Sequence, residues 1–257
     1  MVHPRPEAII VGLGQLGRTL AEGLVMTGWT VTGVRRGEDP AALPRPELAV
    51  IATGEDDLAP ALASMPASWR EHRILLLQNE LLPYQWETAS VVAPTVLVVW
   101  FSRKPGELIR ELRPSIAWGP HAEHARDALG VLGLHTEVVE DERSLLAALV
   151  EKNTYIWAMN LAALIVEQPT TSRVLGPAGE GVFEALAREA IAVQHAAIGR
   201  DVVDADSVVA AVHATLAGEG ERRLGGRSAR RRAERLVELA RRLGVPAPIA
   251  ELALKRS

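Results

Sequence analysis

The chain has 257 residues, of which 48% are hydrophobic and 23% charged, and its formal net charge is −4. This length suits one large domain or two ordinary ones. The negative charge gives no reason to expect a polyanion such as nucleic acid as partner. The absence of cysteine excludes disulfides and thiolate metal sites and fits a reducing compartment.

Membrane and export signals are also missing from the sequence. The N-terminal residues "MVHPRPEAII" lack the apolar core of a signal peptide. The most apolar run, residues 91–101, is interrupted by Pro94 and is shorter than the roughly 20 residues that span a bilayer. We therefore expect a cytoplasmic protein with no membrane partner.

Short apolar runs alternate with helical patterns in the first half of the chain. Strands are expected at residues 7–12, 29–34, 47–53, 72–78, 95–101, 115–119 and 135–140. A helix is expected at 15–27, with Leu16, Leu20, Leu24 and Met26 facing inward, and another between the last two strands. The first four of these runs, separated by helices or turns, predict a parallel sheet built of βαβ units.

The second half shows no convincing strand. Helices are expected at residues 142–168, 178–199, 205–218 and 227–244, each closed by Gly or Pro. The fold class is therefore α/β, with an α/β domain at 1–142 followed by an all-helical domain at 143–257.

A glycine-rich loop lies between the first strand and the first helix, in "AIIVGLGQLGRTL". In a G-x-G-x-x-G loop of this kind, Gly12 permits the tight turn, Gly14 lets the backbone approach a pyrophosphate, and Gly17 lets the helix pack on the sheet. The phosphates would then lie at the positive end of the helix. The alternative is a glycine-rich turn in an α/β protein that binds something else or nothing. We assign a Rossmann-type dinucleotide-binding domain, with Gly12, Leu13, Gly14, Gln15, Leu16 and Gly17 as cofactor-binding residues.

The end of the second strand bears on which dinucleotide is bound. NAD sites usually place an acidic residue there for the ribose 2′-hydroxyl, whereas this chain has Arg35 and Arg36. Two guanidinium groups suit a 2′-phosphate, and the acids Glu38 and Asp39 come slightly later. The alternative is a solvated basic turn. The sequence thus favours NADP over NAD.

Four segments resemble the ketopantoate reductase family, within the wider group of 6-phosphogluconate-dehydrogenase-like reductases. They are "GLGQLG", "GWTVTGVRR", "ILLLQNE" and "RELRPSIAWG". The resemblance places the family's cofactor- and substrate-contacting asparagine at Asn79, and its lysine after the third strand at Thr53, and we assign both residues to the cofactor site. It implies an NADPH-dependent reductase of a small, anionic 2-oxo acid or a related carbonyl, and leaves a homodimer open.

The helix expected at 142–168 resembles the family's lysine helix. Lys152 matches its catalytic lysine and Asn160 its second asparagine, while the first asparagine falls on Ile156. A partly desolvated lysine can donate a proton to a carbonyl oxygen as hydride arrives at carbon. The alternative is that Lys152 lies on the solvated side of the helix. Thr154 and Tyr155 are secondary candidates, because either hydroxyl could contact a substrate.

The family's catalytic glutamate has no counterpart at the expected place. Near the end, "RRLGVPAP" resembles the family's closing helix, and counting back from Gly244 puts the glutamate near Ser228. The nearest acids farther along the same helix are Glu234 and Glu238. This departure leaves two alternatives open: a reductase of an imine or another carbonyl, and a non-catalytic NADP-binding protein.

Two further patterns are weaker. His121 and His124 lie one helical turn apart, but without a third ligand nearby we expect no metal site. The basic run at 222–235 carries an apolar helical stripe and i,i+4 charge pairs, which are typical of a solvated helix rather than a nucleic-acid surface. An arginine near the start of that helix could still reach an anionic substrate.

Overall fold

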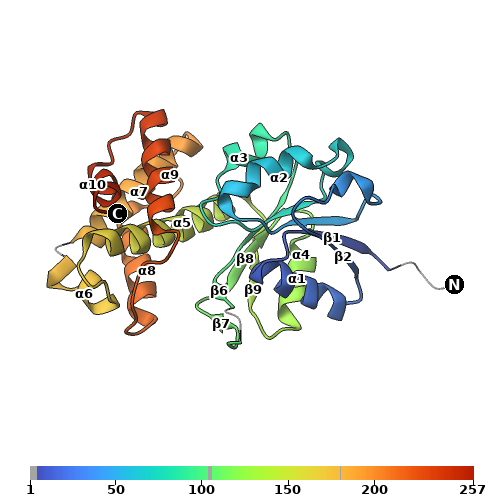
Figure 1. Cartoon of the computed structure of the whole chain (residues 1–257), viewed down its shortest axis with the longest axis horizontal. Coiled ribbons are helices and arrows are strands. Elements are labelled where there is room, and N and C mark those ends of the chain that lie inside the picture. The colour runs from blue at the N-terminus through green and yellow to red at the C-terminus, as the bar shows by residue number, and fades with distance from the viewer. Residues whose placement is uncertain (1–4, 104–105, 180) are drawn as a thin grey trace. The chain divides into compact units, whose positions relative to one another are not determined.

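A computed structural model describes residues 5–103, 106–179 and 181–257. The chain forms two compact units, Met1–Leu145 and Leu146–Ser257, each considered by itself below. The first unit is drawn from blue to green in Figure 1 and the second from yellow to red.

A seven-stranded sheet forms the centre of the first unit. Its strands, in spatial order, are β2 (Thr30–Val34), β1 (Glu7–Val11), β3 (Leu48–Ile51), β4 (Ile74–Leu76), β5 (Thr95–Val98), β8 (Ser115–Trp118) and β9 (Thr136–Val138). Neighbouring strands are parallel except β5 and β8, which are antiparallel. The expected parallel sheet is therefore confirmed for β1 to β4, on whose sequence pattern it rested, whereas β8 runs antiparallel to β5. The reason is the connection, in which the short hairpin β6 (Phe101–Ser102) and β7 (Arg110–Glu111) replaces a crossover helix.

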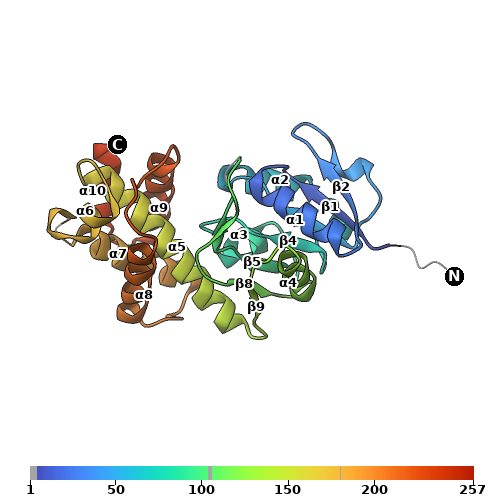
Figure 2. The ribbon, with the colours of Figure 1, turned by 90° about the horizontal axis from the view of Figure 1, so that it is seen from below.

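Helices cover both faces of the sheet. The α-helices of this unit are α1 (Gln15–Met26), α2 (Leu58–Ser64), α3 (Pro83–Thr88) and α4 (Ala122–Gly130), and the 3₁₀ turns are η1 (Pro40–Ala42), η2 (Glu55–Asp57) and η3 (Ala67–Trp69). Figures 1 and 2 show α1 and α4 together on one face and α2 on the other. The apolar core between α1, α4 and the sheet includes Ala8, Ile10, Leu20 and Leu24.

One inward assignment on α1 is wrong. Leu20 and Leu24 are buried and Leu16 is half-buried, but Met26 is 59% exposed. Two residues on from Leu24 is about 200° around a helix, so Met26 points away from the buried stripe. Helix α1 ends there, and Thr27 is its C-cap.

The second unit is helical in its described part. Its elements are α5 (Glu142–Ile165, which begins in the last residues of the first unit), α6 (Thr171–Leu175), η4 (Pro177–Gly179), α7 (Val182–Ile198), α8 (Ala205–Gly218), α9 (Ala229–Leu243) and α10 (Pro248–Arg256). Helix α5 is buried on every side over residues 152–158, as expected for a central helix. Helix α7 packs against α8, α9 and α10. None of the described helices is long and apolar enough to cross a membrane.

Candidate functional site

The glycine loop between β1 and α1 is held by close backbone packing. Gly12 has φ +96°, and a Cβ there would lie 2.7 Å from the Ala52 carbonyl oxygen. A Cβ on Gly17 would collide with the carbonyl oxygen of Gly12. Only glycine fits either place, because the loop lies against the end of β3 and α1 lies against the loop.

Gly14 differs from Gly12 and Gly17 because the space in front of it is open. A Cβ there would meet nothing within 4 Å, and φ is −70°, which any residue can adopt. Gly14 is the N-cap of α1, with no side-chain cap and no acidic residue in the first turn. The first N–H groups of the helix have no intrahelical partner and lie at its positive end, so an anion can approach them.

A pocket of about 480 Å³ opens beside the loop. It brings together six of the expected cofactor residues: Gly12, Leu13, Gly14, Arg35, Arg36 and Thr53. Helix α2 supplies another part of the lining with Pro60, Ala61 and Ser64. The Thr53 hydroxyl oxygen is buried and has no hydrogen-bond partner among the described residues. A buried hydroxyl without a partner at a pocket is a place where a ligand's polar group would be stabilised.

The rim of this pocket carries charges of both signs. Nη2 of Arg36 lies 3.0 Å from Oδ2 of Asp57, with the two side chains 90% and 56% exposed. The Arg35 backbone N–H donates to Oε2 of Glu38 at 2.7 Å. Exposed ion pairs of this kind contribute little, so a phosphate can compete for Arg36. Sequence reasoning noted Glu38 but missed Asp57, which is 21 residues from Arg36.

A second pocket, of about 640 Å³, shares Leu13 and Gly14 with the first. Gln15 lines it, as do Arg18 and Arg103. Nη1 of Arg103 lies 2.7 Å from Oε2 of Glu22 on α1. The glycine loop therefore borders two pockets.

Three expected cofactor residues do not line either pocket. Leu16 packs against the apolar core, and Gly17 serves the packing of α1 on the loop. Asn79 follows β4, and its Nδ2 donates to Oε1 of Glu55 at 3.1 Å. The sequence alone did not show which of the expected cofactor residues line a pocket.

Lys152 and Asn160 are both buried on α5, 8% and 6% exposed. The alternative placing Lys152 on the solvated side is therefore wrong. Its Nζ lies 5.5 Å from the ring centroid of Tyr155, a cation–π distance. Nδ2 of Asn160 donates to the Ile156 carbonyl oxygen at 2.8 Å, so this amide group is partly used within the helix.

A polar cluster surrounds the Tyr155 hydroxyl, which donates to Oε1 of Glu219. Nη2 of Arg222 lies 3.0 Å from the same carboxylate oxygen and 3.3 Å from the hydroxyl. Burial, then the contact with Glu219, raises the pKa of Tyr155 above its usual value, so this hydroxyl stays protonated. Sequence reasoning named Tyr155 but missed Glu219. The reason is that Glu219 lies in "AGEGER", which is typical of a loop after α8.

The two acids suggested from the sequence of α9 lie in other surroundings. Glu234 pairs with Arg231 at 3.1 Å and Arg230 at 3.2 Å, and these arginines, Arg231 first, hold its pKa below the usual range. Glu238 is exposed. The side chain of Glu219, by contrast, is only 7% exposed.

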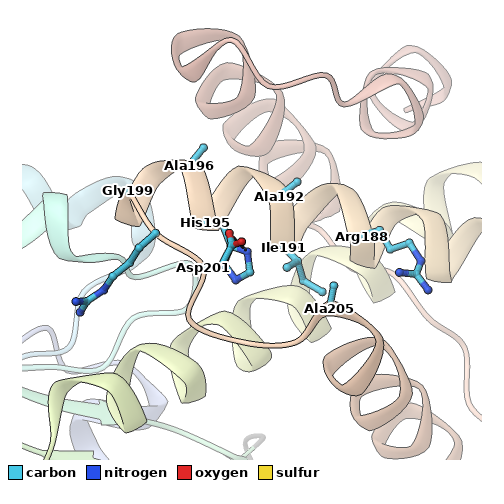
Figure 3. Close-up of a pocket in the computed structure, with 9 residues that line it drawn as sticks. Arg188, Ile191, Ala192, His195, Ala196, Gly199, Asp201 and Ala205 are labelled. Carbon is cyan, nitrogen blue, oxygen red and sulfur yellow. Dashed lines mark ion pairs between the residues drawn. The ribbon is translucent and has the colours of Figure 1, made fainter.

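Other titratable groups have structural partners. Nδ1 atoms of His121 and His124 lie 3.3 Å apart, and the described residues contain no group of three or more metal-ligating side chains. A pocket of about 520 Å³ lies along α7. Among its lining residues, His195 and Asp201 lie side by side (Figure 3). Nδ1 of His195 is 2.9 Å from Asp201, and its Nε2 accepts the Val202 N–H at 3.4 Å. With both ring nitrogens engaged, His195 ties α7 to the following loop.

Comparison with known proteins gives structural neighbours only. No protein-family model matches the sequence, and no match is found among curated proteins. A PanE/ApbA family ketopantoate reductase from Ralstonia eutropha JMP134 is 18% identical with a TM-score of 0.73, covering 97% of this chain and 96% of that one. A dimeric ketopantoate reductase from Staphylococcus aureus is 15% identical with a TM-score of 0.66, covering 97% and 98%. A D-mandelate dehydrogenase in complex with NADH is 14% identical with a TM-score of 0.59, covering 96% of each chain.

These similarities define the class of the fold. The chain has the fold of ketopantoate reductases, with a Rossmann-type N-terminal part and a helical C-terminal part. The fold class expected from the sequence is thereby confirmed, as is the resemblance at the level of fold.

Proposed function

We propose that this protein is an NADPH-dependent reductase of a small 2-oxo acid or a related carbonyl compound. The observation that carries the proposal is the glycine loop with the two pockets that it borders, one of them lined by Arg35 and Arg36. We assign cofactor binding to residues 1–142 and substrate binding to residues 143–257.

The residues around the loop fit a nicotinamide dinucleotide. Gly14 leaves room for a pyrophosphate at the N-terminus of α1, and a side chain there would take that room. Arg35 and Arg36 would hold the 2′-phosphate of NADP, since charge-assisted hydrogen bonds to phosphate are strong. Thr53 would offer its unpartnered hydroxyl to the same ligand. Gln15 would contact the half of the cofactor beyond the loop. The neighbour bound to NADH supports a nicotinamide cofactor, and the two arginines favour NADP.

When bound, reduced NADP supplies a hydride to the substrate carbon. The carbonyl oxygen then needs a proton, and Lys152 is the candidate donor because it is buried on the central helix of the second unit. We further propose that Asn160 orients the substrate and that Asn79 contacts cofactor or substrate. The substrate is a small anion, and neither nucleic acid nor membrane takes part.

We also propose that the protein is a homodimer located in the cytoplasm. A neighbour described as a dimeric ketopantoate reductase supports a homodimer. The lack of cysteine supports a reducing compartment, the cytoplasm.

The direct test is to incubate the protein with NADPH and a panel of 2-oxo acids, aldehydes, ketones and imines, and to follow the nicotinamide absorbance. Oxidation of NADPH with one or more 2-oxo acids is the expected result. Reduction of imines alone would show that the substrate is an imine and not a 2-oxo acid. A protein that binds NADPH but reduces nothing on the panel is a non-catalytic NADP-binding protein, and the proposal of a reductase then fails.

A further inference from the structure

The Arg222 guanidinium lies over the face of α5 that carries Lys152. Residues 152, 155 and 159 are spaced i, i+3 and i+7, which places them on one side of a helix. Nη2 of Arg222 contacts two of these, the Tyr155 hydroxyl at 3.3 Å and the Met159 sulfur at 3.0 Å. Nζ of Lys152 lies over the Tyr155 ring. Two cations therefore flank one tyrosine.

The position of Arg222 is fixed by a buried acid. Its Nη2 lies 3.0 Å from Oε1 of Glu219, whose side chain is 7% exposed, whereas the side chain of Arg222 is 31% exposed. Tyr155 donates to the same carboxylate oxygen, so three side chains share one hydrogen-bonded cluster. A planar guanidinium held in this way loses little freedom when it binds a second anion.

The guanidinium keeps donors for such an anion. All three contacts above are made by Nη2, and Nη1 takes part in none of them. Nε is buried and has no partner among the described residues, so the protein does not saturate this group. The side chain of Arg222 is 31% exposed, and its positive charge with Nη1 as a remaining donor suits a carboxylate.

We propose that Arg222 is the residue that recognises the substrate carboxylate, with Tyr155 and Glu219 as its positioning residues. The assignment rests on the proposed function, because it places the carboxylate of a 2-oxo acid beside Arg222 and the adjoining carbonyl oxygen toward Lys152. It supplies a cation for the anionic substrate proposed above, from a residue outside the family motifs.

The test is calorimetric titration of wild type and variants, each with and without NADP⁺, so that binding is read without turnover. The probes are pyruvate, 2-oxoisovalerate and phenylpyruvate, with 3-methyl-2-butanone as the uncharged counterpart of 2-oxoisovalerate. Arg222→Gln should weaken 2-oxo acid binding about tenfold or more and leave the ketone unaffected. Arg222→Lys should fall between, because it keeps the charge and loses the planar fork. Glu219→Gln should weaken binding less than Arg222→Gln.

Arg222→Gln leaves the buried carboxylate of Glu219 without its cation, which can destabilise the fold. The double variant Arg222→Gln, Glu219→Gln removes both charges and so tests the same site in a protein without that buried unpaired charge. It should lose the preference for acid over ketone as well. The assignment is overturned if a folded Arg222 variant binds the oxo acids as wild type does, or if wild type binds none of them. If binding of the oxo acids depends on Arg222 but the protein never oxidises NADPH, the proposed reductase activity is wrong and the carboxylate site is confirmed. If kcat/KM for the oxo acids is undiminished in Arg222→Gln, the reductase activity stands and Arg222 does not recognise the substrate.

Discussion

The glycine loop of the first unit and the polar face of α5 in the second unit are built in different ways. The loop, its turn and its helix start lie within six consecutive residues, and their roles follow from local backbone geometry. The cluster on α5 depends on residues far along the chain, since Glu219 and Arg222 are 64 and 67 residues from Tyr155. A local motif can be read from the sequence, whereas a cluster assembled by packing of helices requires the structure.

The largest effect is expected from Gly14→Val in the glycine loop. Backbone angles and open space at Gly14 tolerate a side chain, so the protein should fold while binding of NADPH and NADH is abolished. Equilibrium titration followed by fluorescence or calorimetry measures this. Gly130→Val is the matched control, because Gly130 also has open space and lies outside both pockets. Normal cofactor binding by a folded Gly14→Val protein would place the dinucleotide elsewhere.

The next largest effect concerns Lys152. Removing a positioned general acid typically lowers the rate by about 10²–10⁴-fold. Lys152→Ala should therefore reduce kcat at least about a hundredfold, with the dissociation constant of NADPH nearly unchanged. Steady-state kinetics and cofactor titration on the same preparation separate the two. Unchanged turnover in the variant removes Lys152 from the mechanism.

A smaller effect tests the charged rim of the first pocket. Arg35→Ala, Arg36→Ala should weaken NADPH binding about tenfold or more and barely change NADH binding, because only NADPH carries the 2′-phosphate. Asp57→Asn is a useful companion: it frees Arg36 and removes a carboxylate from the pocket, so NADPH should bind at least as tightly as to wild type. Equal preference for both cofactors in wild type and in the double variant would refute the assignment to NADP.

The smallest expected change is at the acids on α9. Glu234 is engaged by two arginines and Glu238 is exposed, so Glu234→Gln and Glu238→Gln should each leave kcat within about twofold of wild type. Assays under the same conditions as for Lys152→Ala provide the comparison. A loss of a hundredfold in either variant would make that acid the replacement for the family's glutamate.

Much of the fold could be predicted, because strand and helix periodicities are local. The end of β1, the start of α1 and all of α8 lie at or within a residue of the expected bounds. The prediction of the fold failed where the local sequence pattern does not reflect the tertiary structure. The antiparallel β8 follows a hairpin that is too short to show a period, and α10 begins at Pro248, which reads as a break although proline is well suited to the first helical position.

The candidate site could be predicted only in part for a related reason. Glycines that must touch backbone, such as Gly12, are specified by the turn itself. Whether Asp57 turns toward Arg36, or Glu219 toward Tyr155, depends on how distant segments pack. Burial of Lys152 likewise follows from the helices around α5, which a single amphipathic pattern does not reveal.

A crystal structure of the protein grown with NADPH would show whether the pocket beside Gly14 binds this cofactor. We expect the pyrophosphate at the N-terminus of α1 and the 2′-phosphate within hydrogen-bond distance of Arg35 and Arg36. NADPH bound at another place would exclude this pocket as the cofactor site, and NADPH bound here with its 2′-phosphate turned away from both arginines would refute their assigned role.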